Sequence, residues 1–110
     1  MDIQKILEKE GIPAYTSGSF TEYEIVPSPV WIFTNMMTDN YYTDKNVSIE
    51  VLHYTIALYS NNPDGLRDKV KDKQKELIEL GAFCGGIVDL KTLEPTLFGY
   101  GFECTIIQKY

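Results

Sequence analysis

The sequence predicts an α+β fold, in which an antiparallel or mixed sheet of four to five strands with a projecting hairpin packs against two helices. The order of candidate elements indicates this class: a helix, two or three strands, a second helix and two final strands. A strand-like run over residues 47–59, unusually long for so small a protein, indicates the projection. The 110 residues fit one domain, 1–110, because domains typically hold about 100–150 residues.

Residues 2–10 are expected to form a short helix. Ile3, Ile6 and Leu7 create one apolar stripe at helical spacing. Gly11 follows at the position where a helix end favours a left-handed residue. The helix is therefore predicted to end there.

A poorly paired segment is expected between this helix and the first core strand. Residues 12–15 read as a brief extended segment, residues 16–19 as a flexible turn and residues 22–26 as a weak strand. Pro27 and Pro29 then end that strand, because proline supplies no backbone N–H and restricts the residue before it.

Two strands are predicted on either side of the hairpin. Residues 30–34 (VWIFT) form a compact apolar run typical of a core strand, and residues 36–46 connect it to the long strand. Within residues 47–59 the apolar positions change from odd to even at Leu52, which predicts a β-bulge there. This strand would span roughly 43 Å at about 3.3 Å per residue, so one end is expected to project as an arm.

The second helix is predicted over residues 64–80. Asn62 or Asp64 is expected to cap its start, and Gly81 stands at its end. Gln74 interrupts an otherwise regular apolar face. The predicted buried stripe consists of Leu66, Val70, Leu77 and Leu80.

The chain closes with two strands, residues 83–90 and 97–107, around a turn at residues 93–96. Strict alternation in the last strand predicts one apolar, packed face. Gly99 and Gly101 begin the opposite face and leave room for a ring or another backbone to lie against it. The apolar positions are Phe98, Tyr100, Phe102, Cys104 and Ile106.

Charge argues against nucleic-acid binding. The chain has 10 basic and 16 acidic residues, for a net charge of −6, so the basic footprint required by a phosphate backbone is missing. The helix candidate over residues 64–79 is neutral, so the whole negative charge lies outside it. An acidic surface of this kind is still compatible with a conduit along which DNA slides by like-charge repulsion.

Composition also bears on the cellular compartment in which the protein is expected. No apolar run approaches the roughly 20 residues that a membrane span requires, and the N-terminus resembles an amphipathic helix more than a signal peptide. We therefore expect no membrane association and synthesis in the cytosol. Cys84 and Cys104 fit neither a disulfide scaffold nor a zinc site, and are expected to be reduced, partly buried thiols.

No catalytic or metal-binding pattern is present. Asp39, Asp44, Glu50 and His53 match no calcium loop, and His53, the only histidine, is expected to be a half-exposed strand residue. Cys84 lacks the neighbouring base and electropositive setting of a catalytic cysteine. We therefore expect no enzymatic activity, no cofactor and no metal.

Tyr41 and Tyr42 indicate an interface. They are adjacent aromatic residues in a polar connection, so as strand residues they would point to opposite faces and at least one would be exposed. Exposed tyrosine is typical of interfaces because it buries a large area at low entropic cost. Ordinary packing within the hairpin is the alternative. The candidate assembly residues are Met36, Met37, Tyr41, Tyr42, Asp44, Lys45 and Asn46.

Several of these segments, taken in order, make up a pattern that extends over nearly the whole chain. The first helix closes on residues 11–15 (GIPAY), and a proline precedes the apolar strand at 30–33 (VWIF). The hairpin carries YTDK at residues 42–45, and the next strand ends in Tyr-Ser. The helix at 64–80 and the closing strand YGFECTI complete the pattern. In this order and length the chain resembles the tail-terminator and tail-completion proteins of long-tailed bacteriophages and prophages.

The resemblance implies an α+β structural protein that assembles as a ring, commonly a hexamer. Such a ring sits on the growing tail tube, stops its polymerisation and forms the surface that joins the head. The implied partners are copies of the same chain, the tail tube protein and the head-tail connector. The implied location is the head-proximal end of the virion tail, after synthesis in the host cytoplasm. The family carries no catalytic residues.

Two other functions remain open. Another head-tail connector part, such as a head-closure or stopper protein, would have a similar architecture. A small ligand-binding or enzymatic α+β domain would instead hold a pocket behind the glycine face of the last strand. An enzyme normally gathers titratable groups in one place, and the chain's single histidine and two cysteines do not suggest such a cluster.

Overall fold

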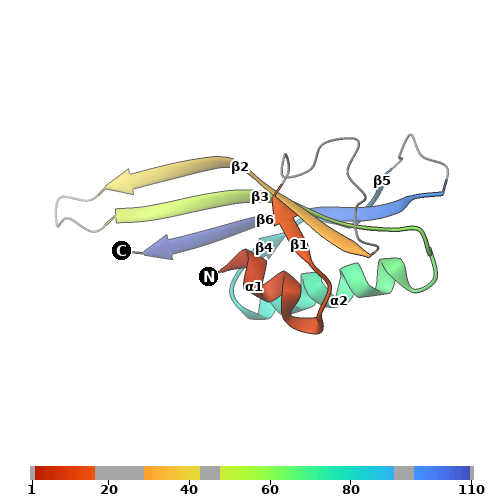
Figure 1. Ribbon diagram of the computed structural model, residues 1–110. Helices are drawn as coiled ribbons and strands as arrows, with labels where there is room; N and C mark the ends of the chain where they lie inside the picture. Colours follow the sequence, from red (N-terminus) through yellow and green to blue (C-terminus); the bar gives the residue numbers. More distant parts are fainter. Residues whose placement is uncertain (1, 17–28, 43–47, 91–95, 110) are drawn as a thin grey trace.

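The computed structural model describes residues 2–16, 29–42, 48–90 and 96–109. It confirms the α+β class: helices α1 (Ile3–Leu7) and α2 (Leu66–Glu79) lie along the same side of one mixed sheet (Figure 1). In these described ranges the sheet has six strands, more than the four to five expected. The strands are β1 (Ala14–Thr16), β2 (Val30–Tyr42), β3 (Ser48–Ser60), β4 (Phe83–Cys84), β5 (Val88–Leu90) and β6 (Phe98–Lys109).

The sheet is built around β3, which pairs antiparallel with β2 on one side and with β6 on the other. β1 adds to the outer edge of β2 and runs parallel to it, unlike the other described strand pairs. β4 and β5 both add to the outer edge of β6. They divide the single strand expected over residues 83–90 into two short pieces, separated by residues 85–87.

The N-terminal helix forms as expected. The Asp2 carboxylate caps α1 by accepting a bond from the Lys5 amide at 3.2 Å. The last turn, η1 (Glu8–Glu10), tightens into a 3₁₀ helix, and Gly11 ends it with a φ of 88°.

Helix α2 begins later than predicted. Its N-cap is Gly65, in a left-handed conformation with a φ of 68° and without a side-chain cap. The capping prediction was therefore wrong: the Asn62 side chain accepts a bond from the Asp64 amide at 3.0 Å and stabilises the preceding turn. At the other end Gly81 adopts a φ of 99°, in agreement with the predicted stop.

The buried face of α2 differs from the predicted stripe at two positions. Leu66, Val70 and Leu77 are buried as expected. Leu80 is exposed, because the helix ends at Glu79 and Leu80 is its C-cap. Lys73 occupies the remaining helical position on the buried face.

Strand β2 is much longer than the predicted core strand. Residues 36–42 continue it as a regular partner of β3, so the expected 36–46 connection was wrong over this part. The predicted bulge at Leu52 was also wrong: β3 pairs with β6 without interruption, and the register shift lies between Asn35 and Met37 of β2. Alternation misled the prediction because, near Ile49, neither face of β3 is buried.

The core lies between the sheet and the helices. The helix side of the sheet contributes Trp31, Phe33, Leu52, Ile56, Leu58, Phe102, Cys104 and Ile106. The room expected over the glycines of β6 is filled. A Cβ on Gly99 would lie 2.7 Å from the Tyr59 ring, and one on Gly101 would lie 2.7 Å from the Ile56 carbonyl oxygen.

Three strands project beyond the helices. The end of β2, the start of β3 and the end of β6 run on past α1 (Figure 1). The segments concerned are residues 36–42, 48–53 and 106–109, in which Leu52 and Ile106 at the base still belong to the core. We call these segments the arm. The projecting hairpin expected from the sequence is thus accompanied by a third strand, and the molecule measures 53 × 28 × 23 Å along its principal axes.

Some expectations lie outside the described residues. They are the weak strand at 22–26, most of the turn at 16–19, most of the turn at 93–96, and the hairpin tip with Asp44, Lys45 and Asn46.

Replacing Gly101 with alanine tests the close packing of β6 on β3. The new Cβ would meet the Ile56 carbonyl oxygen at 2.7 Å and the Leu90 side chain at 3.1 Å, so the strands must separate. We expect Gly101→Ala to lower the free energy of unfolding by about 1–3 kcal/mol in urea denaturation. Gly86→Ala is the matched control, because a Cβ there meets nothing within 4 Å. Equal stability of the two variants would contradict this packing.

Candidate assembly surface

Four of the predicted assembly residues lie on the arm segment of β2. All four side chains are exposed: Met36 by 66%, Met37 by 54%, Tyr41 by 56% and Tyr42 by 79%. The other three, Asp44, Lys45 and Asn46, lie outside the described residues. The arm thus presents two adjacent methionines and two adjacent tyrosines to solvent.

The bulge in β2 decides which face each of these side chains occupies. Before it, Phe33 pairs with Ile56 and points toward the helices. After it, Met37 pairs with His53 and Tyr41 with Ile49, which places both on the opposite face of the sheet. We call this the open face. Tyr42 pairs with Ser48 and points to the helix side.

Further exposed apolar side chains share the open face, and the sequence analysis does not predict them. Ile107 of β6 is 53% exposed and pairs with Val51, while Phe83 of β4 is 64% exposed and pairs with Thr105. The adjacent Ile106 and Ile107 were the available signal, since neighbours in a strand point to opposite faces. Exposed apolar residues that cluster in this way are typical of interaction surfaces.

A hydrogen-bonded set of polar side chains extends across the open face at the base of the arm. The His53 ring contacts the Asp39 carboxylate through Nε2 at 3.3 Å and the Thr105 hydroxyl through Nδ1 at 3.3 Å. His53 is half-buried, as expected for a strand histidine. Both ring nitrogens are engaged, so the contacts join β2, β3 and β6 across the arm. Within the described ranges, no group of three or more acidic, histidine or cysteine side chains is placed to hold a metal ion.

A separate cleft of about 350 Å³ lies on the helix side, between η1 and α2. Its apolar wall is formed by Ile12 and Trp31, and charged side chains form the remainder. The indole N–H of Trp31 is buried and has no acceptor among the described residues. The charged lining residues are Glu10, Lys69, Asp72, Lys73 and Glu76.

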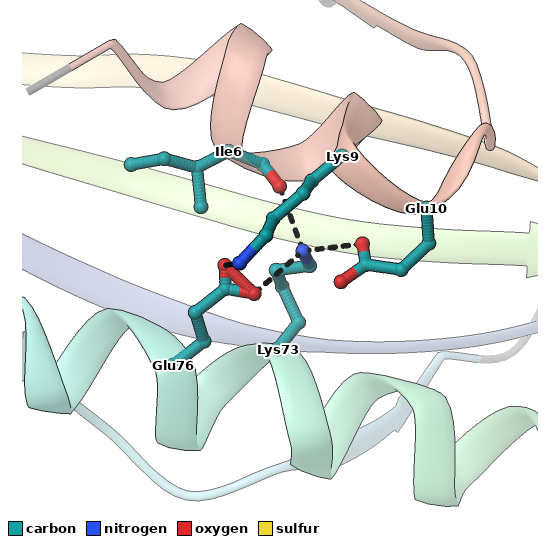
Figure 2. A network of polar contacts seen from close by, with 5 residues as sticks. All are labelled: Ile6, Lys9, Glu10, Lys73 and Glu76. Atoms are coloured by element: carbon teal, nitrogen blue, oxygen red, sulfur yellow. Dashed lines mark hydrogen bonds and ion pairs between the residues drawn. The ribbon is translucent and has the colours of Figure 1, made fainter.

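Lys73 is the most constrained of these charges, with a side chain only 4% exposed (Figure 2). Its ammonium donates to the Ile6 carbonyl oxygen at 2.7 Å, to Glu10 at 2.7 Å and to Glu76 at 3.1 Å. These bonds use all three N–H groups, and Lys9 adds a longer contact to Glu76 at 3.8 Å. Lys73 therefore fastens the N-terminal helix to α2 and has no N–H left for a ligand.

The two cysteines are neighbours in the sheet although they are 20 positions apart in the chain. Cys84 and Cys104 pair directly across β4 and β6, with 3.9 Å between their sulfur atoms, and both are free thiols as expected. Burial raises the pKa of Cys104 to about 12 and also raises the pKa of Cys84. Both thiols are therefore protonated at neutral pH and are poor nucleophiles.

Replacing Glu10 tests the Lys73 network through pH. The hydrogen bond from Lys73 lowers the pKa of Glu10 below its ordinary value of 4.5. Its contribution to stability is therefore complete above pH 4.5 and is lost as the pH falls through the lowered pKa. We expect Glu10→Gln to unfold at lower urea concentration at neutral pH and to lose less stability on acidification than the wild type. Glu8→Gln, in the same turn, is the control; a Glu10→Gln profile parallel to the wild type would contradict the network.

Three observations bear on the class of protein. No helix among residues 2–16, 29–42, 48–90 and 96–109 is long and apolar enough to cross a membrane. No protein-family model matches the chain. No curated protein matches it either.

Proposed function

We propose that this chain is a structural protein of a long-tailed bacteriophage or prophage that forms a ring on the tail tube. The ring stops tail polymerisation and provides the surface that is joined to the head. The observation that carries the proposal is the arm, which extends beyond the helices and exposes Met36, Met37, Tyr41 and Tyr42. The resemblance in element order and length is its second support.

The arm favours assembly because of the residues it exposes. Methionine and aromatic side chains are enriched at the cores of protein interfaces, whereas most solvent-facing strands carry charged residues. On the open face, Met37, Tyr41 and Ile107 surround the compact His53–Asp39 pair. An arm of this composition gains stability when a partner covers it.

Capping follows from the geometry of a closed ring. Heterologous contacts between identical copies close into a ring, and six is the number that the family resemblance implies. One face of the ring would match the end of the tail tube, and the other would meet the head-tail connector without offering a site for another tube subunit. The net charge of −6 fits this role, because an acidic ring does not retain DNA that passes through it.

A head-closure or stopper role is the nearest alternative, since it uses the same kind of surface with a different partner. A ligand-binding domain is the alternative from another class. The cleft at Lys73 favours it in size alone, because small-molecule sites are about 300–1,000 Å³. The saturated Lys73 weighs against it: a built polar site normally keeps donors for its ligand.

Electron microscopy of particles made with this gene interrupted distinguishes these roles. We expect overlong tails detached from filled heads, because tube polymerisation is no longer stopped. Tails of normal length beside unjoined or leaking heads would assign the chain to head closure. Intact, joined virions would contradict both structural roles and favour a ligand.

Replacing both arm tyrosines tests whether the exposed surface is used. We expect Tyr41→Ser with Tyr42→Ser to reduce the yield of joined virions at least tenfold when it replaces the wild-type gene, since large aromatic contacts dominate interfaces. The monomer should remain folded, because both side chains are more than half exposed. Ile78→Ser, which removes an exposed apolar residue of α2, is the control and should be silent. Normal virion yield from the double variant would contradict the use of this surface.

A further inference from the structure

The arm has two outer edges, and neither is paired along its full length by the described strands. β1 covers β2 only at residues 31–33. β4 covers β6 as far as Thr105, and of the described strands only β3 pairs with residues 106–109. Residues 36–42 contain no proline to block pairing. Among the described strands, none pairs with these two edges of the arm beyond those residues.

The backbone groups that point outward can be assigned. The Gly85 amide donates to the Glu103 carbonyl oxygen at 2.8 Å, so Glu103 and alternate residues after it, including Ile107 and Lys109, face the β4 edge. The Trp31 amide donates to the Pro13 carbonyl oxygen at 2.9 Å. Before the bulge, the backbone N–H and C=O groups of the odd-numbered residues of β2 therefore point to its outer edge. The bulge reverses this alternation and turns Thr38, Asn40 and Tyr42 outward.

The two edges match each other. β2 and β6 are both antiparallel to β3 and therefore run in the same direction, so β6 of one copy can lie parallel to β2 of the next. Asn40 and Gln108 stand at the same level, because both pair with Glu50. In a parallel pairing at that level, the Asn40 amide would donate to the Ile107 carbonyl oxygen and the Lys109 amide to the Asn40 carbonyl oxygen.

The side chains agree with this register. Ile107 and Lys109 stay on the open face, beside Asp39 and Tyr41 of the neighbouring copy. The β2 edge contributes the negative charge of Asp39. The β6 edge contributes the positive charge of Lys109, which is the next residue on the same face after Ile107, the residue beside Asp39. In this pairing Ile107, which is exposed in the single chain, would pack between Met37 and Tyr41 of the neighbour.

We infer that a second copy of this chain adds to the arm by parallel β-strand pairing, the β6 edge of one copy against the β2 edge of the next. This inference rests on the proposed ring-forming role and names the contact that closes the ring. Because the two edges are different surfaces, the contact is heterologous and each copy uses both. A partner strand from another protein, or an isologous pairing of two β2 edges, is the outcome that the test separates from it.

Proline substitutions test the two edges separately. Asn40→Pro removes an outward N–H of β2, and Ile107→Pro removes one of β6; proline is tolerated where the N–H faces away from the sheet. Asn40→Ala and Ile107→Ala keep the N–H groups and are the matched controls. Lys109→Glu weakens the same contact without a backbone change. Circular dichroism establishes that each variant is folded.

Sedimentation velocity is measured from dilute samples to about 1 mM, the range in which weak contacts dissociate. We expect the wild type and both alanine variants to form oligomers and each proline variant to stay monomeric. An equimolar mixture of the two proline variants should form dimers only, because one intact edge remains on each copy. Lys109→Glu should require at least tenfold higher concentration to assemble.

Three results would overturn the inference. They are a wild type that stays monomeric throughout, a folded Asn40→Pro variant that assembles like the wild type, and an Ile107→Pro variant that assembles while Asn40→Pro does not. The last would indicate isologous pairing of β2 edges. Expressing Asn40→Pro in place of the wild-type gene separates this inference from the proposed function. Normal tails from a variant that is monomeric in solution would contradict the ring, whereas overlong tails would support both.

Discussion

The structure depends on the antiparallel pairing of β3 with β2 and β6 along almost its whole length. Close to the helices this pairing presents Ile56, Leu58 and Phe102 to one core. Beyond Leu52 and Ile106, which still belong to the core, the same ladders continue into the arm. There no other described element packs on them, and the His53 contacts to Asp39 and Thr105 add to the pairing. The backbone hydrogen bonds thus extend the sheet into solvent as an arm that has no separate hydrophobic core.

The bulge in β2 gives this extension its two different faces. If Met36 paired regularly with His53 instead of being bulged, Met37 and Tyr41 would point to the helix side and Thr38 to the open face. The bulge therefore places Met37 and Tyr41 on the open face, where Ile107 of β6 also lies. It also reverses which backbone groups face outward, so one local insertion sets both the surface chemistry and the edge of β2.

The sequence predicted the elements whose pattern and packing agree, and missed those determined by distant residues. Alternation in residues 97–107 reveals β6 because one of its faces is truly buried. The sequence predicts a connection over residues 36–42, because their mixture of apolar, polar and aromatic side chains shows no alternation when both faces of a strand are in solvent. Lys73 could not be expected in a buried stripe, since its three acceptors come from Ile6, Glu10 and Glu76, two of them far away in the chain. Among the assembly residues, adjacent aromatics marked Tyr41 and Tyr42, but Ile107 joins them only through strand pairing.

Cryo-electron microscopy of the tail at its head-proximal end tests the central claim most directly. The account predicts a closed ring of this chain as the last layer on the tail tube, with density continuous from the β6 edge of one copy to the β2 edge of the next. A tail whose terminal ring is built from another protein, with this chain elsewhere or absent, would contradict the account.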